Sequence, residues 1–363
     1  MDLKPRKLDL YIFKKFILSF FIALVLIIGI VIIFDISEKI NDFVENNAPI
    51  RAIIFDYYLN FIPYFMNMFS PLFVFLTVIF FTSRMAANSE IIAILSGGVS
   101  FHRMMVPYMG SALLIALLSL GLNLWVIPRA NDTRLDFEAQ YVKHHNDYKH
   151  RNIHYQIAPG EFVFVETFSS WNNVAYRFTL EEVEEGRLVS KLSAEQANYD
   201  TTVNAWRLKN YVLREYTEGL QDNIRTGSQI DTVIPLRLED FYRNEKTVER
   251  LPIDQLTELI DTQKMRGDAN VQFAQIELHN RFSLPFSAFI LTIIGVSLSS
   301  KKKRGGIGWN IALGIGLSFT YILFMRFSQM FVYTGTLPPW VAIWLPNVVF
   351  TIIAAVMYRL APK

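Results

Sequence analysis

Long apolar stretches without charged residues lie toward both ends of the chain, and a polar section separates them. A helix needs roughly 20 such residues to cross a hydrocarbon core of about 30 Å. We therefore expect six transmembrane helices, three on each side of the polar section: Phe16–Phe34, Ile53–Thr82, Met104–Ile127, Phe282–Leu298, Ile307–Tyr333 and Trp340–Tyr358. The first stretch exceeds the apolar core of a signal peptide and lacks a small-x-small cleavage site before Asp35, which favours a span over a cleaved leader.

The polar section contains runs in which apolar and polar residues alternate, the pattern of half-buried strands. These runs are Glu161–Phe168, Val174–Leu180, Arg187–Leu192 and Ala205–Leu213. Turn signals occur between and after them, at Pro159-Gly160, Glu185-Gly186, Glu218-Gly219 and Thr226-Gly227-Ser228. This spacing predicts an antiparallel sandwich or an open barrel with an apolar interior.

Helical segments flank the predicted strands. Arg129–Lys149 is polar and can continue the third span, Pro252–Lys264 has the pattern of a short helix, and Asn270–Arg281 leads into the fourth span. The sequence thus predicts a polytopic α-helical membrane protein, with transmembrane helices arranged 3+3 around an inserted all-β domain. We expect the first three spans in residues 1–128, the β-rich domain in 129–280 and the last three spans in 281–363.

The overall composition agrees with a membrane protein, since 52% of the residues are hydrophobic and only 19% are charged. The net charge is +2, and basic residues cluster at segment ends rather than along one face, which argues against a nucleic-acid partner. The chain has no cysteine, which excludes disulfides and thiolate metal sites.

Basic residues gather at connections on one side of the predicted membrane segments: Lys4, Arg6, Lys7, Lys14, Lys15, Arg84, Arg103, Lys301, Lys302, Lys303, Arg304, Arg359 and Lys363. The positive-inside rule then places both termini in the cytoplasm and the inserted domain outside it. Trp125, Tyr333 and Trp340 fall at predicted outer boundaries, where amphipathic rings prefer the headgroup level. The two signals agree on one orientation.

Sequence motifs for catalysis are missing from the chain. It has no G-x-x-x-x-G-K-[ST], H-E-x-x-H or G-x-S-x-G motif, so we expect no ATPase, protease or other enzyme active site. Four histidines in a polar segment raise the question of a metal site: His144, His145, His150 and His154. Because that segment is solvent-facing and no cysteine accompanies it, solvated histidines are the favoured interpretation, with no metal and no cofactor.

The connection between the second and third spans has the signals of a short helix over residues 88–97. Residues able to cap it stand at both ends: Asn88 or Ser89 at the start, and Gly97 or Gly98 at the end. Glu90 suits the positive end of the helix dipole. The exposed face would offer apolar residues beside Glu90 and suit docking into a groove of another protein: Ile91, Ile92 and Leu95. A helix that rests on lipid is the alternative.

Arg326 is the one arginine within the fifth span, and it lies 18 residues beyond Gly308. That distance is about five helical turns, or about 27 Å, so both residues share a face and Arg326 lies near the outer leaflet boundary. Small residues repeat on this face and would let another helix approach closely: Gly308, Ala312 and Gly316. A buried arginine there could bind a lipid phosphate; an arginine that snorkels to the interface is the alternative.

Lys39 and Arg51, in the first outer loop, offer the same phosphate-binding chemistry as Arg326. The signal is weaker at Lys39, because acidic residues surround it in the sequence: Asp35, Glu38 and Asp42.

Three stretches carry a family resemblance: Ser89-Glu90 followed by Gly98-Val99-Ser100, Trp125-Val-Ile-Pro-Arg-Ala-Asn131, and Glu277-Leu-His-Asn-Arg-Phe-Ser-Leu-Pro285. Together they make the chain similar, over essentially its whole length, to the lipopolysaccharide-export permeases of the LptF/LptG (YjgP/YjgQ) family. The first span and the Leu337-Pro-Pro339 loop favour LptG over LptF. Gly295-Val296-Ser297 departs from the family, since many members have proline in place of this serine, and it puts the inner end of the fourth span in doubt.

The resemblance implies one permease of an ABC-type exporter in the inner membrane of a Gram-negative bacterium. A second LptF/LptG-like permease would pair with it, and an LptB-like ATPase dimer would grip the cytoplasmic helices. Lipopolysaccharide would enter from the outer leaflet, and a periplasmic jellyroll would pass it to LptC/LptA-like bridge proteins. Residues of the coupling helix would be Ser89, Glu90, Ile91 and Gly98; the first and fifth spans would border the lateral gate, and Lys39 would correspond to lysines that meet lipid phosphates in LptG-type members.

Two other functions fit the pattern less well. A permease for another lipid or for lipoproteins would differ in the lipid that co-purifies. A membrane-anchored sensor with a ligand-binding β-domain would work without an ATPase, and the absence of any cytoplasmic signalling domain in the sequence argues against it.

Overall fold

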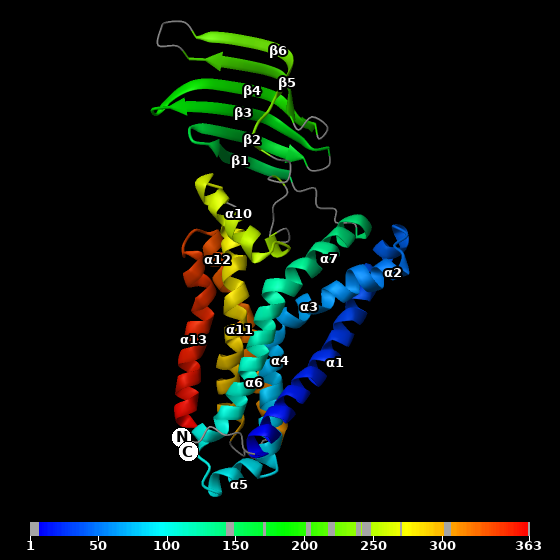
Figure 1. Ribbon diagram of the computed structural model, residues 1–363, viewed down its shortest axis with the longest axis vertical. Coiled ribbons are helices and arrows are strands. Elements are labelled where there is room, and N and C mark those ends of the chain that lie inside the picture. Colours follow the sequence, from blue (N-terminus) through cyan, green and yellow to red (C-terminus); the bar gives the residue numbers. More distant parts are fainter. Residues whose placement is uncertain are drawn as a thin grey trace. The chain divides into compact units, whose positions relative to one another are not determined.

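The structure, a computed structural model, describes residues 7–142, 149–169, 172–200, 205–216, 222–236, 241, 248–268, 271–300 and 306–361 (Figure 1). The chain divides into two compact units. The membrane unit consists of Met1–Lys143, Glu249–Ile253 and Gln275–Lys363, and the sheet unit consists of His144–Val248 and Asp254–Ala274. The sheet unit is narrower than residues 129–280, because α7 (Ile127–Tyr141) packs against η1 (Ile53–Tyr58) and α3 (Leu59–Met68) of the membrane unit.

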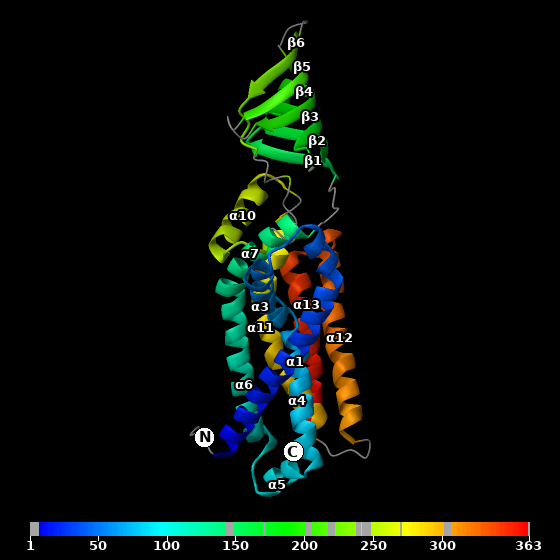
Figure 2. The same ribbon diagram turned by 90° about the vertical axis from the view of Figure 1, so that its right-hand side faces the viewer.

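Among the described residues, six helices are long and apolar enough to cross a membrane, as the sequence predicts. They are α1 (Lys7–Glu45), α4 (Ser70–Ala87), the continuous α6–η2–α7 (Phe101–Tyr141), α11 (Val271–Ser299), α12 (Gly306–Tyr333) and α13 (Pro339–Leu360). Within the membrane unit, α1 begins and α13 ends at the same end as the short helix α5 (Glu90–Ser96), as Figures 1 and 2 show.

The prediction of one span over Ile53–Thr82 is wrong. The chain there forms α2 (Ile50–Ala52), the π-helical η1 and then α3, and it turns at Phe69 before α4 begins. Phe69 has φ −95° and ψ 3°, outside the helical geometry of its neighbours. Pro71 stands at the start of α4, where its missing N–H would have no helical partner. Only α4 is long enough to span.

The other predicted spans are confirmed, with longer extents, whereas the predicted helix over Arg129–Lys149 stops at Tyr141 and Lys149 already belongs to β1. The third span continues through η2 (Leu122–Val126) and α7, and it ends at Val142, which has an extended backbone with φ −108° and ψ 114°. The predicted helix at Asn270–Arg281 and the fourth span are one element, α11. The predicted short helix at Pro252–Lys264 is α10 (Ile253–Met265).

Polar side chains of neighbouring helices satisfy carbonyl groups that prolines leave without a helical donor. Proline has no N–H, so the carbonyl four residues before it loses its partner. Pro285 frees the carbonyl of Arg281, and Asn123 on η2 donates to that oxygen at 3.3 Å. Pro346 frees the carbonyl of Ala342, to which the Ser328 hydroxyl donates. Such contacts keep two proline-containing spans helical inside an apolar unit.

The sheet unit contains one antiparallel sheet in the order β1-β2-β3-β4-β5-β6, so neighbours in sequence are neighbours in space (Figure 2). The strands are β1 (Lys149–Ala158), β2 (Glu161–Ser169), β3 (Val174–Glu184), β4 (Arg187–Asp200), β5 (Ala205–Glu215) and β6 (Asn223–Thr232). The strands predicted from alternation are confirmed as β2 to β5. The edge strand β6 has a mixed polar sequence without clear alternation, so the pattern does not reveal it. The prediction misses β1, although Ile153, Tyr155 and Ile157 alternate there with polar residues.

One predicted turn is wrong and two are confirmed. Thr226-Gly227-Ser228 lies inside β6, where Gly227 pairs with Tyr211 of β5. A Cβ at Gly227 would come within 2.6 Å of the Tyr211 ring, so this glycine makes room for a ring rather than for a turn. The turns at Pro159-Gly160 and Glu185-Gly186 are present. Glu218-Gly219 lies outside the described residues.

The apolar face of the sheet has its own core. Trp206 and Phe178 are fully buried there, and Phe241 stacks on Phe168 with ring centroids 4.4 Å apart. The Trp206 indole donates to the Leu236 carbonyl at 2.8 Å, which holds the segment after β6 over this face. Each of these large side chains contributes roughly 1.5–3 kcal/mol by leaving water. The described strands form a single covered sheet, and neither the second sheet of a sandwich nor a closed barrel is seen among them.

Candidate functional site

The connection between α4 and α6 (Phe101–Gly121) holds the expected short helix, α5. Ser89 occupies the N-cap position with a left-handed backbone, φ 61°, and its side chain makes no capping hydrogen bond. Gly97 follows the last residue, and Gly98 then takes φ 83°, a conformation that glycine adopts easily. Backbone turns at both ends therefore limit α5 to seven residues, Glu90–Ser96.

The expected apolar face of α5 is partly wrong. Ile91 is 1% exposed and packs in a cluster with Ile12 and Phe16 of α1. Leu95 is partly buried against the same cluster, whereas Ile92 is 50% exposed. Because so short a helix makes only about two turns, one side of it must pack on the unit that carries it. The surface left for a partner is Ile92 with Glu90 beside it.

The Glu90 carboxylate is held by two donors. The Tyr11 hydroxyl of α1 donates to Oε2 at 3.2 Å, and the Asn88 amide donates to Oε1 at 3.4 Å. The carboxylate is only partly exposed, and the contact with Tyr11 joins residues 79 positions apart in the chain. Glu90 is thus oriented before any partner binds.

Of the two alternatives for Arg326, the structure favours the unburied arginine, because Arg326 is exposed on α12. Its Nη1 donates weakly to Gln329 at 3.4 Å. Gly308, Ala312 and Gly316 are exposed too, and among the described residues no atom lies within 4 Å of a Cβ built at Gly308 or Gly316. This face of α12 is open within the chain.

The spans differ sharply in how far the chain covers them. In the most apolar stretch of α1, 17% of the residues are buried, and in that of α12, 22%. The corresponding values are 67% for both α4 and α11. The first and fifth spans therefore present long apolar faces that the described part of this chain leaves bare, while the second and fourth form its core.

Lys39 lies in a polar cluster near the end of α1. Its ammonium donates to Asp35 at 2.9 Å and to the Tyr57 hydroxyl, and Glu138 of α7 is 4.0 Å away. The Tyr58 hydroxyl also donates to Asp35, at 3.1 Å. Burial, with the negative charges of Asp35 and Glu138, raises the pKa of the Tyr57 phenol well above its usual value, so this hydroxyl stays protonated. Carboxylates of the same chain thus balance the positive charge of Lys39.

Arg134 belongs to the same cluster, although the sequence analysis does not single it out. Its guanidinium lies 3.7 Å from Glu138 and 4.0 Å from Glu249, and it stands over the Tyr64 ring at 4.6 Å. The only signal in the sequence is the four-residue spacing of Arg134 and Glu138 on a polar helix. Arg51, by contrast, is exposed and forms no ion pair with a described residue.

Arg281 is another buried charge that sequence reasoning did not identify. It is 2% exposed, and its Nε donates to Glu277 one turn earlier on α11 at 2.8 Å. Both Nη atoms lack a hydrogen-bond partner among the described residues. The signal here is the Glu277–Pro285 stretch itself, which holds an i, i+4 ion pair ahead of a proline inside an apolar helix.

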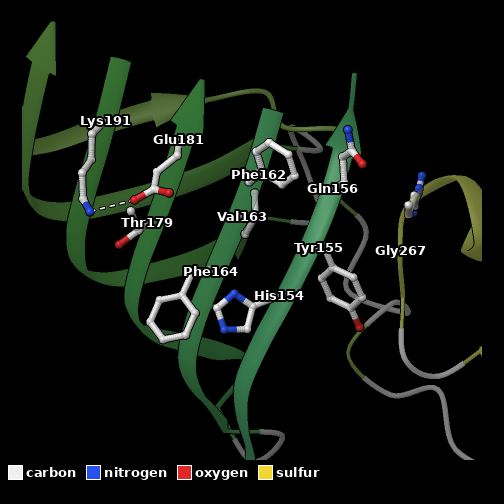
Figure 3. Close-up of a pocket in the computed structure, with 11 residues that line it drawn as sticks. His154, Tyr155, Gln156, Phe162, Val163, Phe164, Thr179, Glu181, Lys191 and Gly267 are labelled. Carbon is white, nitrogen blue, oxygen red and sulfur yellow. Dashed lines mark hydrogen bonds and ion pairs between the residues drawn. The ribbon is translucent and has the colours of Figure 1, made fainter. Parts of the chain in front are cut away.

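A shallow hollow with a volume of about 530 Å³ lies on the sheet (Figure 3). His154 of β1 and Phe164 of β2 lie side by side there, with ring centroids 4.6 Å apart, and Lys191 pairs with Glu181 at 2.7 Å. His144 and His145 lie outside the described residues, as does the side chain of His150. Among the residues that the structure describes, no cluster of three potential metal ligands is present.

A family model for the "Lipopolysaccharide export system permease LptF/LptG" matches residues 10–360, from the first turns of α1 to the last residue of α13. No curated protein matches the chain. The match does not distinguish LptF from LptG, but it covers both triplets of spans and the inserted sheet. The chain therefore belongs to the LptF/LptG family of lipopolysaccharide export permeases, as a multi-pass inner-membrane transport subunit rather than a catalytic enzyme.

Proposed function

We propose that this chain is one permease of an ABC-type exporter that extracts lipopolysaccharide from the outer leaflet of the inner membrane and passes it to a periplasmic bridge. The observation that carries this proposal is the pair of open spans. Only 17% of the most apolar stretch of α1 and 22% of that of α12 are buried within the described part of the chain, and α12 also bears the exposed small residues Gly308, Ala312 and Gly316. Such a face suits close approach of a second helix with lipid between the two permeases.

The orientation follows from charge. Basic residues at the ends of the spans favour cytoplasmic termini, a cytoplasmic α5 and a periplasmic sheet unit. The common position of α5, the start of α1 and the end of α13 at one end of the membrane unit is consistent with this assignment (Figure 1).

The partners follow from the surfaces. An LptB-like ATPase dimer would receive α5 through Ile92 and Glu90, and a second LptF/LptG-like permease would face α1 and α12. LptC/LptA-like bridge proteins would take lipid from the sheet unit. Acyl chains need an apolar path across water, since each exposed CH₂ costs roughly 0.8 kcal/mol. The apolar face of the sheet, which the segment after β6 covers in this structure, is our candidate for this path.

Cationic side chains would meet the lipid phosphates. Arg326 and Arg51 are exposed and have no carboxylate partner among the described residues. Lys39 would take part only after its contacts with Asp35 and Tyr57 are exchanged. ATP-driven closure of the ATPases would move α5, narrow the lipid-filled cavity and expel the lipid toward the sheet.

Purification with a co-expressed LptB-like ATPase tests the proposal. The ATPase, a second permease and lipopolysaccharide should co-purify with the chain, and mass spectrometry of proteins and lipids identifies them. Glu90→Ala should lose the ATPase or its coupling to export while the chain remains inserted, and Glu258→Ala, on the exposed face of α10, is the matched control. Another lipid in place of lipopolysaccharide, or normal ATPase binding and export by Glu90→Ala, would contradict the proposal.

A further inference from the structure

The first turns of α1 are fastened to α6, the helix that follows α5. Asp9 accepts two hydrogen bonds from the guanidinium of Arg103 at the start of α6, at 2.7 and 2.5 Å. A bidentate pair of this kind fixes both the distance and the angle between two elements. The base of α1 is therefore positioned relative to the chain that leaves α5.

The same end of α1 also contacts α5 directly. Ile12 and Phe16 are fully buried and share a cluster with Ile91, the second residue of α5. Tyr11, next to Ile12 on α1, donates to the Glu90 carboxylate at the start of α5. The two helices thus share a hydrogen bond and contribute to one apolar cluster.

The geometry of Tyr11 suits orientation more than stability. Its ring is 39% exposed, with the Lys15 ammonium 5.6 Å from the ring centroid, and the 3.2 Å hydrogen bond is open to solvent. A contact of this kind contributes little to the free energy of unfolding. It does fix one oxygen of Glu90, while Asn88 contacts the other. The carboxylate is left with a defined direction and unused lone pairs.

We propose that Tyr11 is a positioning residue for Glu90, and that the contact makes α5 and the base of α1 move as one body. The inference rests on the proposed function, in which α5 receives an ATPase. A displacement of α5 then passes directly to α1, one of the two open spans, without first passing through the core formed by α4 and α11. Glu90 serves both steps, since it faces the partner and is tied to α1.

Tyr11→Phe tests the positioning role, because it keeps the ring and removes only the hydroxyl. In the purified complex with its ATPase and second permease, we expect the ATPase to remain bound and lipopolysaccharide released per ATP hydrolysed to fall about five-fold, the order of one ordinary hydrogen bond that is open to solvent. Tyr358→Phe is the matched control, since that hydroxyl lies 3.1 Å from His102 on α6 and forms no hydrogen bond with a described residue of α5 or α1. Its ratio should not change.

A double-mutant cycle separates positioning from packing. With Glu90→Met already in place, which keeps the chain length and removes both acceptor oxygens, Tyr11→Phe should cost far less than it does alone, because the two residues act through one contact. Additive losses would overturn the proposal, and so would an unchanged ratio in Tyr11→Phe alone. These results are distinct from failure of the proposed function, in which the complex with the unaltered chain itself neither binds the ATPase nor releases lipopolysaccharide.

A cross-link tests the joint movement of the two helices. The chain has no cysteine, so Lys15→Cys with Ala93→Cys creates a single pair between α1 and α5 that keeps both Tyr11 and Glu90 in place. Bridging the pair with a flexible bis-maleimide should leave transport at the level of the unbridged double variant. If bridging stops transport while ATP hydrolysis continues, the two helices separate during the cycle and the proposal is wrong.

Discussion

The open spans α1 and α12 and the covered spans α4 and α11 are all apolar enough to cross a membrane, but their surroundings within the chain differ. Two glycines on α12 show the difference within one turn. A Cβ built at Gly314 would collide with the Ile79 side chain of α4, whereas one built at Gly316 would meet nothing among the described residues. Gly314 allows close packing between α12 and α4, whereas Gly316 lies on the face that we propose contacts the second permease. A small residue in a membrane helix can therefore allow packing within the chain or lie on an uncovered face, and the structure is needed to tell which.

The largest effect is expected on the covered side. Gly314→Leu forces a side chain into the space of Ile79 and should lower the stability of the membrane unit by about 1–3 kcal/mol, the usual cost of overpacking. Thermal unfolding of the detergent-purified chain, followed by loss of the monodisperse peak in size-exclusion chromatography, measures the change. An unchanged midpoint would show that α12 does not pack on α4 as described.

A smaller loss is expected where a polar contact holds the covered spans. Asn123→Ala removes the donor to the Arg281 carbonyl and the acceptor of the 2.6 Å hydrogen bond from Asn67. Contacts of this kind average about 0.6 kcal/mol in membrane proteins, so the pair should cost about 1 kcal/mol. The same thermal assay applies, with Leu118→Ala on the exposed side of α6 as the control that should change little.

On the open side, substitution should leave the fold intact and affect assembly. Gly316→Leu should change the stability of the isolated chain by less than about 0.5 kcal/mol, since nothing opposes a side chain there. It should lower the amount of second permease that co-purifies. If the Gly316→Leu variant still pairs normally with the second permease, the small-residue face of α12 is not part of the interface. If the isolated variant unfolds, this face of α12 is not open as described.

The smallest change in stability is expected at Arg326. Arg326→Gln loses one weak 3.4 Å contact and should leave the unfolding midpoint where it is. Lipopolysaccharide captured by the complex should nevertheless fall several-fold if the guanidinium holds a phosphate. Arg359→Gln is the control, because Arg359 is an exposed arginine in the last turn of α13, far along the chain from the α12–α13 connection near Arg326. This variant should capture lipid normally.

Much of this architecture could be predicted from sequence. Apolar length reveals the spans, alternation reveals β2 to β5, and turn residues reveal α5 and place Glu90 at its start. The second span is harder to predict. The stretch from Ile53 to Phe69 contains one charged residue, Asp56, and two asparagines, Asn60 and Asn67, so its composition resembles that of a span. Only the turn at Phe69 separates α3 from α4. Hydropathy reports the amount of apolar surface and not where a helix breaks.

The candidate site was less predictable, for a physical reason at each residue. A helix of seven residues offers too short a pattern to show which side packs, so the burial of Ile91 could not be foreseen. An arginine in a span gives no sign of whether its face meets protein or lipid, and Arg326 proves to be exposed. The contacts of Tyr11 with Glu90 and of Arg134 with Glu249 join residues 79 and 115 positions apart, beyond any local pattern.

The central claim is that lipid reaches the transporter along the open faces of α1 and α12. Photo-cross-linking residues placed at Phe34 on α1, Phe327 on α12 and Val356 on α13 test it directly, since all three side chains are exposed and only the last lies on another span. In an actively exporting complex, Phe34 and Phe327 should capture lipopolysaccharide and Val356 should capture only bulk phospholipid. Equal capture at all three positions, or none at Phe34 and Phe327, would contradict the account.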